Sequence, residues 1–368
     1  MRKIFTLFLL LTIAGVMKAQ DPSFSQFYAN RIYLNPAFTG LEQGLSFAGV
    51  YRVQWRNVDD GFRSYMASVE LKEPFIRSGF GLTFFQDVQG LAELTSTSIG
   101  LSYAYTIQMD NHNVHVGMQA LWNQKSLDWS KIIFSDQLDP VLGNVYSTSA
   151  IQALERVSFT DFNIGAIWRF KANMKLGHRR FKETHNSIGI SLHHAPSLFA
   201  GTRGNESFQN LETRTAPRIT LHAGSIIPAF VVGAGRKRIS FSPNIKYDIQ
   251  GENVFTPSQS LQVLTYGCYV LYEGVYLGAM YQNKFLASGF RHTNAMILTL
   301  GAYVDTGRRD SNTYFVGFSY DANATGVGTR AGGVYEVAFR WTIANAPTIF
   351  GGIGRSRSKQ ILDCHHFF

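Results

Sequence analysis

The chain of 368 residues is poor in charge and almost free of cysteine. Only 16% of its residues are charged, against about 25% in an average soluble protein. Its two cysteines, Cys268 and Cys364, are too few for a disulfide framework or a thiolate metal site. Aromatic residues make up 14% of the chain, which excludes a disordered protein of low hydrophobicity. The chain is therefore expected to fold, with its apolar residues spread along the sequence.

Long apolar runs are also missing, apart from one at the start. Residues 4–16 are mostly apolar and follow Arg2 and Lys3, and the small Ala19 comes shortly after them. This order is typical of a secretory signal peptide, and the run is shorter than the roughly 20 residues that a spanning helix needs. We therefore predict a cleaved leader over residues 1–19.

Alternation with a period of two runs through the rest of the chain. In residues 45–55, large apolar side chains such as Phe47 and Tyr51 alternate with smaller or polar ones such as Ser46 and Arg52. Successive side chains of a strand point to opposite faces, so such a segment has one apolar face and one polar or small face. Fourteen segments are expected to be strands: 45–56, 62–71, 78–86, 95–107, 113–123, 160–170, 186–194, 217–226, 238–249, 259–272, 274–282, 293–304, 312–321 and 333–343.

These segments predict an all-β fold, an outer-membrane antiparallel β-barrel of about 14 strands with an irregular N-terminal segment. Most of them have the roughly 9–12 residues that a tilted strand needs to cross a bilayer. A secreted β-sandwich or propeller would also alternate, but the polar faces are poor in Lys and Glu, which favours a lumen over open water. We expect the barrel over residues 45–343, after a plug-like or periplasmic segment 20–44 and before a periplasmic tail 344–368.

Connection lengths predict an orientation for this barrel. With both termini in the periplasm, the two longest connections, residues 124–159 and 195–216, face outside, as is usual in such barrels. Segments 171–185 and 227–237 are long for periplasmic turns. Basic residues lie on the periplasmic side, where they could contact an acidic partner or form a solvated rim beside lipid headgroups. The candidates for partner contact are Arg179, Arg180, Arg308 and Arg309.

The segment before the first predicted strand is rich in aromatic residues and contains two prolines. It reads Asp-Pro-Ser-Phe-Ser-Gln-Phe-Tyr over residues 21–28 and Leu-Asn-Pro-Ala-Phe-Thr-Gly over residues 34–40. Proline cannot donate to a β-ladder, so a regular strand is not expected. The aromatic side chains still need cover, which a lumen or its periplasmic mouth would supply. The partner-contacting candidates in this segment are Phe24, Gln26, Phe27, Tyr28, Asn35 and Pro36.

These two stretches closely resemble the start of the PorP/SprF family of type IX secretion system membrane proteins. Residues 126–140, which end in Asp-Gln-Leu-Asp-Pro, resemble a loop of that family, and their candidate contact residues are Asp136, Gln137 and Asp139. Residues 318–323 and 332–341 resemble the family's last strands. The end of the chain, Cys364-His365-His366-Phe367, is similar to a Cys-Pro-x-Phe terminus, with His365 in place of the proline.

The resemblance implies an integral protein of the bacterial outer membrane that is not an enzyme and serves type IX secretion. Family members are associated with gliding motility and with export or surface anchoring of large adhesins that carry a C-terminal secretion domain. The expected partners are such an adhesin, other type IX secretion or periplasmic proteins, and outer-membrane lipid, but not nucleic acid. The residues alone leave a porin or small-solute transporter open, and also a soluble surface adhesin.

Two histidine-containing motifs are candidates for a metal site. His193 and His194 are adjacent at a predicted strand end, so they are expected to point to opposite faces and not to chelate together. Cys364, His365 and His366 would need further ligands to hold a metal. We predict no metal and no cofactor.

Carboxylates within the predicted strands point to a lumen network. Asp321 begins a pattern like a calcium loop, but Gly332 stands where that loop needs a glutamate, so a hairpin is the better interpretation. Three other carboxylates are expected to pair with basic neighbours in the lumen rather than to serve in acid–base catalysis. The expected network comprises Glu70, Asp248 and Glu336 with Arg52, Lys246 and Arg340.

Overall fold

The computed structural model describes residues 21–58, 61–148, 154–175, 181–199, 207–208, 215–232, 237–251, 254–256, 260–286, 293–305, 312–323, 331–346 and 348–349. The predicted leader, most of the predicted tail with Cys364, His365 and His366, and the four candidate arginines at 179, 180, 308 and 309 lie outside these residues. Within the described part of the chain, no helix has the length and apolarity needed to cross a membrane.

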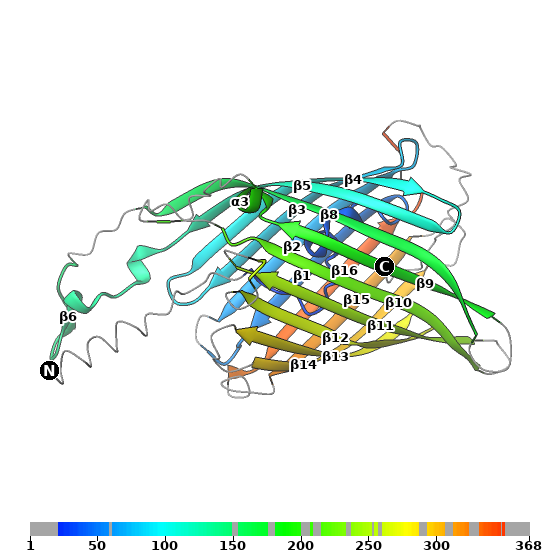
Figure 1. Cartoon of the computed structure of the whole chain (residues 1–368). Helices are drawn as coiled ribbons and strands as arrows, with labels where there is room; N and C mark the ends of the chain where they lie inside the picture. The colour runs from blue at the N-terminus through cyan, green and yellow to red at the C-terminus, as the bar shows by residue number, and fades with distance from the viewer. Residues whose placement is uncertain are drawn as a thin grey trace.

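Fourteen antiparallel strands form one closed barrel (Figure 1), which confirms the predicted fold class and strand number. Closure is made by β16, which pairs with β1 from Leu45 opposite Ile343 to Gln54 opposite Val334. The barrel strands are β1 (Leu45–Gln54), β2 (Phe62–Glu73), β3 (Ser78–Gln89), β4 (Leu94–Gln108), β5 (His112–Ser126), β8 (Arg156–Lys175), β9 (Phe181–His193), β10 (Arg218–Val232), β11 (Lys237–Gln250), β12 (Leu261–Tyr272), β13 (Val275–Leu286), β14 (Thr293–Asp305), β15 (Thr313–Asn323) and β16 (Val334–Ile343).

Several strands are longer than the alternation predicts. The expected turn at residues 171–185 is mostly strand, because β8 continues to Lys175 and β9 begins at Phe181. The expected turn at 227–237 is reduced in the same way by β10 and β11. In β8 and β9 the added residues are mostly polar, for example Lys171, Asn173 and Glu183, and the backbone ladder continues through them. The apolar pattern therefore marks the part of the strand in lipid and not its end.

The two ends of the barrel differ in their connections. One end, here called the turn end, has short connections such as residues 74–77, 109–111 and 273–274. The other end, here called the loop end, has the two longest connections, residues 127–155 and 194–217. These long connections contain five small elements: η2 (Trp129–Lys131), η3 (Ser135–Gln137), β6 (Leu138–Asp139), β7 (Gly143–Asn144) and α3 (Ala195–Phe199).

The barrel wall has apolar side chains outside and polar ones inside. Leu101 is 67% exposed whereas Ser102 beside it is buried, and the same holds for Phe162 and Asn163. A soluble sandwich or propeller would show the reverse order. Apolar side chains outside and polar side chains inside are expected when lipid surrounds the barrel.

Residues 21–44, here called the N-terminal segment, lie inside the barrel. The segment contains α2 (Arg31–Leu34) and η1 (Pro36–Phe38), and its short helix, dark blue in Figure 1, lies within the ring of strands. It runs from the loop end, where the Asp21 amide donates to Gln250, toward the turn end, where the Gly40 amide donates to Glu70. The main apolar core of the molecule is the contact between this segment and the inner wall.

Candidate functional site

Glu336 of β16 holds the N-terminal segment near the loop end. Its two carboxylate oxygens accept hydrogen bonds from the backbone amides of Ser25 and Gln26, each 2.8 Å long. Arg52 of β1 lies 3.3 Å from Glu336 Oε2 and donates to Ser25 Oγ at 2.8 Å. Ser25 Oγ in turn donates to Asp321 Oδ2 at 2.5 Å. A buried carboxylate is tolerated when amides and a guanidinium satisfy it, as here. The predicted lumen pair of Arg52 and Glu336 is confirmed, and the N-terminal segment is part of it.

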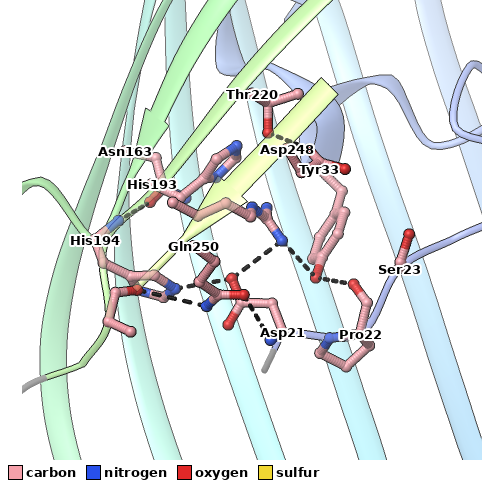
Figure 2. Close-up of polar contacts among 12 residues, drawn as sticks. Asp21, Pro22, Ser23, Tyr33, Asn163, His193, His194, Thr220, Asp248 and Gln250 are labelled. Carbon is pink, nitrogen blue, oxygen red and sulfur yellow. Dashed lines mark hydrogen bonds and ion pairs between the residues drawn. The ribbon is translucent and has the colours of Figure 1, made fainter. Parts of the chain in front are cut away.

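A second ionic cluster surrounds Asp21, the first described residue. Asp21 Oδ2 lies 3.0 Å from His194 Nε2 and 3.0 Å from Arg218 Nη1, and the other ring nitrogen of His194 contacts Asp161. Figure 2 shows Asp21, His194 and Gln250 converging, with Gln250 Oε1 accepting from the Asp21 amide at 3.1 Å. The side chains come from β8, β10, β11 and the residue after β9. The start of the segment is therefore attached to several strands at once.

Neighbouring charges outweigh burial in setting the protonation states of His194 and Asp21. Partial burial alone would lower the pKa of His194, but the charge of Asp21 and the hydrogen bond to Asp161 raise it to about 10. Burial alone would raise the pKa of Asp21, but His194 and Arg218 lower it. At neutral pH the cluster thus contains an imidazolium between two carboxylates.

His193 and His194 both contact the N-terminal segment, so the prediction that they point to opposite faces was wrong. His193 Nε2 lies 3.3 Å from the carbonyl oxygen of Leu34. His194 follows the last residue of β9 and has a left-handed φ of 58°, which turns its side chain toward Asp21. The alternation rule fails here because it holds only within a regular strand.

Asn35 anchors the middle of the N-terminal segment to the wall. Its Nδ2 donates to the carbonyl oxygens of Ala166 (3.2 Å) and Ile190 (3.0 Å). Its Oδ1 accepts from the Ala37 amide at 2.9 Å and so caps η1, which begins with Pro36. Proline suits a first helical position because its missing amide would have no partner there. The Asn-Pro-Ala sequence is therefore explained as a capped turn that also bonds to two strands.

Two glycines allow the close approach of the segment to the wall. A Cβ atom on Gly165 of β8 would overlap Asn35 Oδ1. Gly40, which ends the second motif stretch, has a φ of 64°, a conformation that glycine adopts without steric cost. Its amide donates to Glu70 Oε2 at 3.1 Å.

Glu42 attaches the segment near the turn end. Its Oε1 lies 2.7 Å from Arg31 Nη1 and 2.9 Å from Arg340 Nη1, and its Oε2 accepts from Thr342 Oγ1 at 2.6 Å. Arg340 also donates to the Ala29 carbonyl oxygen at 2.8 Å. The segment is thus held by carboxylates at both ends and by Asn35 in the middle.

The candidate residues of the N-terminal segment all lie in the lumen, packed against the chain itself. Phe24 and Phe27 are each only 3% exposed, and Gln26 donates to the Glu336 carbonyl oxygen. Asp21 and Glu42 were not among the candidates. Asp21 is the first residue of one motif stretch and Glu42 lies two residues after the other, but their partners lie far along the chain, so no local pattern marked them.

Residues 132–148, here called the loop hairpin, contain the three loop candidates. Asp139 Oδ1 accepts from the amides of Val141 (2.8 Å) and Leu142 (2.9 Å), and its Oδ2 accepts from the Tyr146 hydroxyl at 3.0 Å. Asp136 accepts from Thr148 Oγ1 at 3.0 Å. Gln137 Oε1 accepts from the Phe134 amide at 2.8 Å.

Each candidate side chain of the loop hairpin therefore bonds within the hairpin. Within the described part of the chain, no group of three or more His, Cys, Asp or Glu side chains is arranged to hold a metal ion.

Fold and lumen together define an integral outer-membrane β-barrel with its own N-terminal segment packed inside. The model of the family "Type IX secretion system membrane protein PorP/SprF" matches residues 16–341. The chain belongs to this family, which confirms the resemblance seen in its motifs. It is accordingly a type IX secretion component of the outer membrane.

Comparison with curated proteins found no match. Among solved structures, the chain is similar to a FadL homologue from Pseudomonas aeruginosa, with 12% identity, 84% of this chain and 93% of that chain covered, and a TM-score of 0.42. It is also similar to CdiB from Acinetobacter baumannii (9% identity, 82% and 60% covered, TM-score 0.39). Omp33 from Acinetobacter baumannii is a third (7% identity, 83% and 99% covered, TM-score 0.38).

Proposed function

We propose that this protein is a non-enzymatic docking component of type IX secretion and not a conduit for its substrate. In this role it supports export or surface anchoring of a large adhesin-type protein with a C-terminal secretion domain. The observation that carries the proposal is the N-terminal segment in the lumen, held by Glu336, Asn35 and Glu42. A folded or unfolded polypeptide could not pass without displacing it.

The two ends of the barrel would then serve different partners. Barrels of this type have short periplasmic turns and longer outer loops, so we assign the loop end to the outside and the turn end to the periplasm. The exported protein would contact the loop end. Periplasmic parts of the apparatus would contact the turn end, where the chain has Arg179, Arg180, Arg308 and Arg309 in its connections.

The test in cells is removal of the chain, followed by quantification of surface and secreted proteins. We expect one or a few large surface proteins to disappear while the remaining type IX substrates are still exported. Charge reversal of the four arginines is expected to reduce co-purification of periplasmic proteins and to leave the barrel level unchanged. Unchanged surface proteins after removal of the chain would contradict the proposal.

A porin is the competing function, and conductance separates the two. In planar bilayers the native barrel is expected to conduct weakly, because residues 21–40 lie in its lumen. Deletion of residues 21–40 is expected to raise the conductance strongly. A native barrel that already conducts as well as the deletion variant would support a porin instead.

A further inference from the structure

We propose that Leu138, Val141 and Leu142, here called the loop tip, form the docking surface for the exported protein. The partner surface that fits the loop tip is an apolar groove bordered by basic side chains. This inference rests on the proposed function and names the contact through which it acts. It also assigns a different role to Asp136, Gln137 and Asp139, which would shape the loop rather than touch the partner.

The loop tip is apolar and open to solvent. Val141 is 88% exposed, Leu142 is 72% exposed and Leu138 is 51% exposed. Figure 1 shows β6, which contains Leu138, well beyond the ring of strands, so the barrel wall does not cover it. Val145 and Tyr146 next to the tip are also more than half exposed. Clustered exposed apolar side chains on a projecting loop mark an interaction site.

The loop tip is held in shape by hydrogen bonds within the loop hairpin. Asp139 accepts from the amides of Val141 and Leu142 themselves, and β6 pairs with β7 through Leu138 opposite Asn144. The Gln137 carbonyl oxygen accepts from the amides of Val145 (3.1 Å) and Tyr146 (3.2 Å). A preorganised loop loses less conformational entropy on binding than a disordered one, which favours affinity.

The negative charge of the loop hairpin favours a protein over lipid as the binding partner of the loop tip. Residues 132–148 contain two aspartates and no lysine or arginine. An acidic apolar tip is repelled by anionic headgroups, which attract basic segments instead. A protein groove with basic side chains at its border complements it, with the apolar side chains as central anchors.

The first test compares full-length variants in cells whose own copy of the chain has been removed. Val141→Ser with Leu142→Ser is expected to lower the surface level of the dependent exported protein at least about tenfold. Val141→Ile with Leu142→Met keeps the tip apolar and is expected to retain the native level. Both variants keep the backbone amides that bond to Asp139, so both loops are expected to resist protease as the native loop does.

The second test changes charge without changing the apolar tip. Asn144 and Ser147 are exposed neighbours in the same loop hairpin. Asn144→Lys with Ser147→Lys is expected to reduce export, because the new charges face a basic border, while Asn144→Asp with Ser147→Asp retains it. Equal export by the two variants would overturn the charge assignment, and with it the proposal.

The third test identifies the occupant directly. A photo-reactive phenylalanine analogue in place of Leu142 is irradiated in intact cells, and cross-linked products are analysed by mass spectrometry. A cross-link to the exported protein supports the proposal, whereas a cross-link to lipopolysaccharide, or none, overturns it.

If removal of the whole chain abolishes surface display but the Val141→Ser, Leu142→Ser variant restores it, only this inference fails. If removal has no effect, the proposed function fails and takes this inference with it.

Discussion

The N-terminal segment and the loop hairpin use similar polar residues in opposite ways. In the N-terminal segment, polar groups bond to distant strands, as when the amides of Ser25 and Gln26 donate to Glu336. In the loop hairpin, Asp139 accepts hydrogen bonds from residues two to seven positions away, and Asp136 accepts one from Thr148, twelve positions away. The structure of the first region therefore depends on the closed barrel, whereas the hydrogen bonds of the second lie within the hairpin. Polar groups that bond to distant strands attach their segment to the barrel wall. Polar side chains that bond within their own loop shape that loop, and the apolar side chains of Val141 and Leu142 beside them stay exposed.

The largest effect on stability is expected from removal of the Glu336 carboxylate, which holds the N-terminal segment. Glu336→Ala leaves the buried Arg52 with Asp321 as its remaining acidic neighbour and two amides without their acceptor. Breaking a buried ion pair from one side costs roughly 3–5 kcal/mol. We expect a lower unfolding temperature and faster maleimide labelling of a Ser23→Cys probe in a background without Cys268 and Cys364. Glu336→Gln keeps one acceptor and is expected to be intermediate, and labelling at the native rate in both would refute the attachment.

A smaller effect is expected at the middle of the segment. Asn35→Ala removes the donor to Ala166 and Ile190 and the cap of η1, with an expected loss of about 2 kcal/mol of unfolding free energy. Asn35→Asp keeps the cap but turns a carboxylate oxygen toward two carbonyl oxygens, so it should be at least as destabilising as Asn35→Ala. Chemical unfolding in detergent measures both. A milder effect for Asn35→Asp would mean that the cap matters more than the bonds to the wall.

The pH dependence of the Asp21 cluster gives a third test. A raised pKa for His194 means that its stabilising contribution is complete below the ordinary histidine value of about 6.5 and declines until it is lost near pH 10. A lowered pKa for Asp21 means that its contribution is present above about pH 4 and is lost as the pH falls further. The labelling rate of the Ser23→Cys probe is divided by the rate for the same cysteine in the unfolded chain at the same pH, which removes the effect of thiol ionisation. This ratio should be lowest from about pH 4 to 6.5 and rise toward pH 10. His194→Gln should remove the alkaline rise of this ratio, and a ratio profile that does not change in this variant would exclude His194 as its cause.

The smallest effect on the barrel is expected from the loop hairpin. Asp139→Ala removes the acceptor for two amides and for the Tyr146 hydroxyl, so protease should cut the loop faster. The barrel's unfolding temperature and the labelling of the Ser23→Cys probe should not change, because no bond between this hairpin and the N-terminal segment is involved. Asn144→Ala serves as a control for a change in the same hairpin. A shift of the barrel's unfolding temperature in Asp139→Ala would show that the two regions are coupled.

Alternation along the chain was enough to predict the strands, their number and the polar side of the wall. Arg52 and Glu336 could be assigned to the lumen from alternation, because the direction of a strand side chain depends only on its position relative to its neighbours. The family could likewise be recognised from contiguous stretches, such as residues 21–28 and 34–40. The exact strand ends could not be predicted at β8 and β9, since the apolar pattern stops where the lipid stops while the ladder continues.

The position of the N-terminal segment and the partners of its polar residues could be seen only in the folded barrel. Asp21 meets His194 and Arg218, and Ser25 meets Glu336, across separations of well over one hundred residues. Such contacts exist only once the barrel has closed, and no local spacing encodes them. The loop hairpin shows the same limit at short range. Its aspartates are polar motif residues and so were candidates for partner contact, yet they accept hydrogen bonds from within the hairpin and Val141 and Leu142 stay exposed. Which neighbour satisfies a polar side chain depends on the three-dimensional geometry of the loop, which the order of residues alone does not specify.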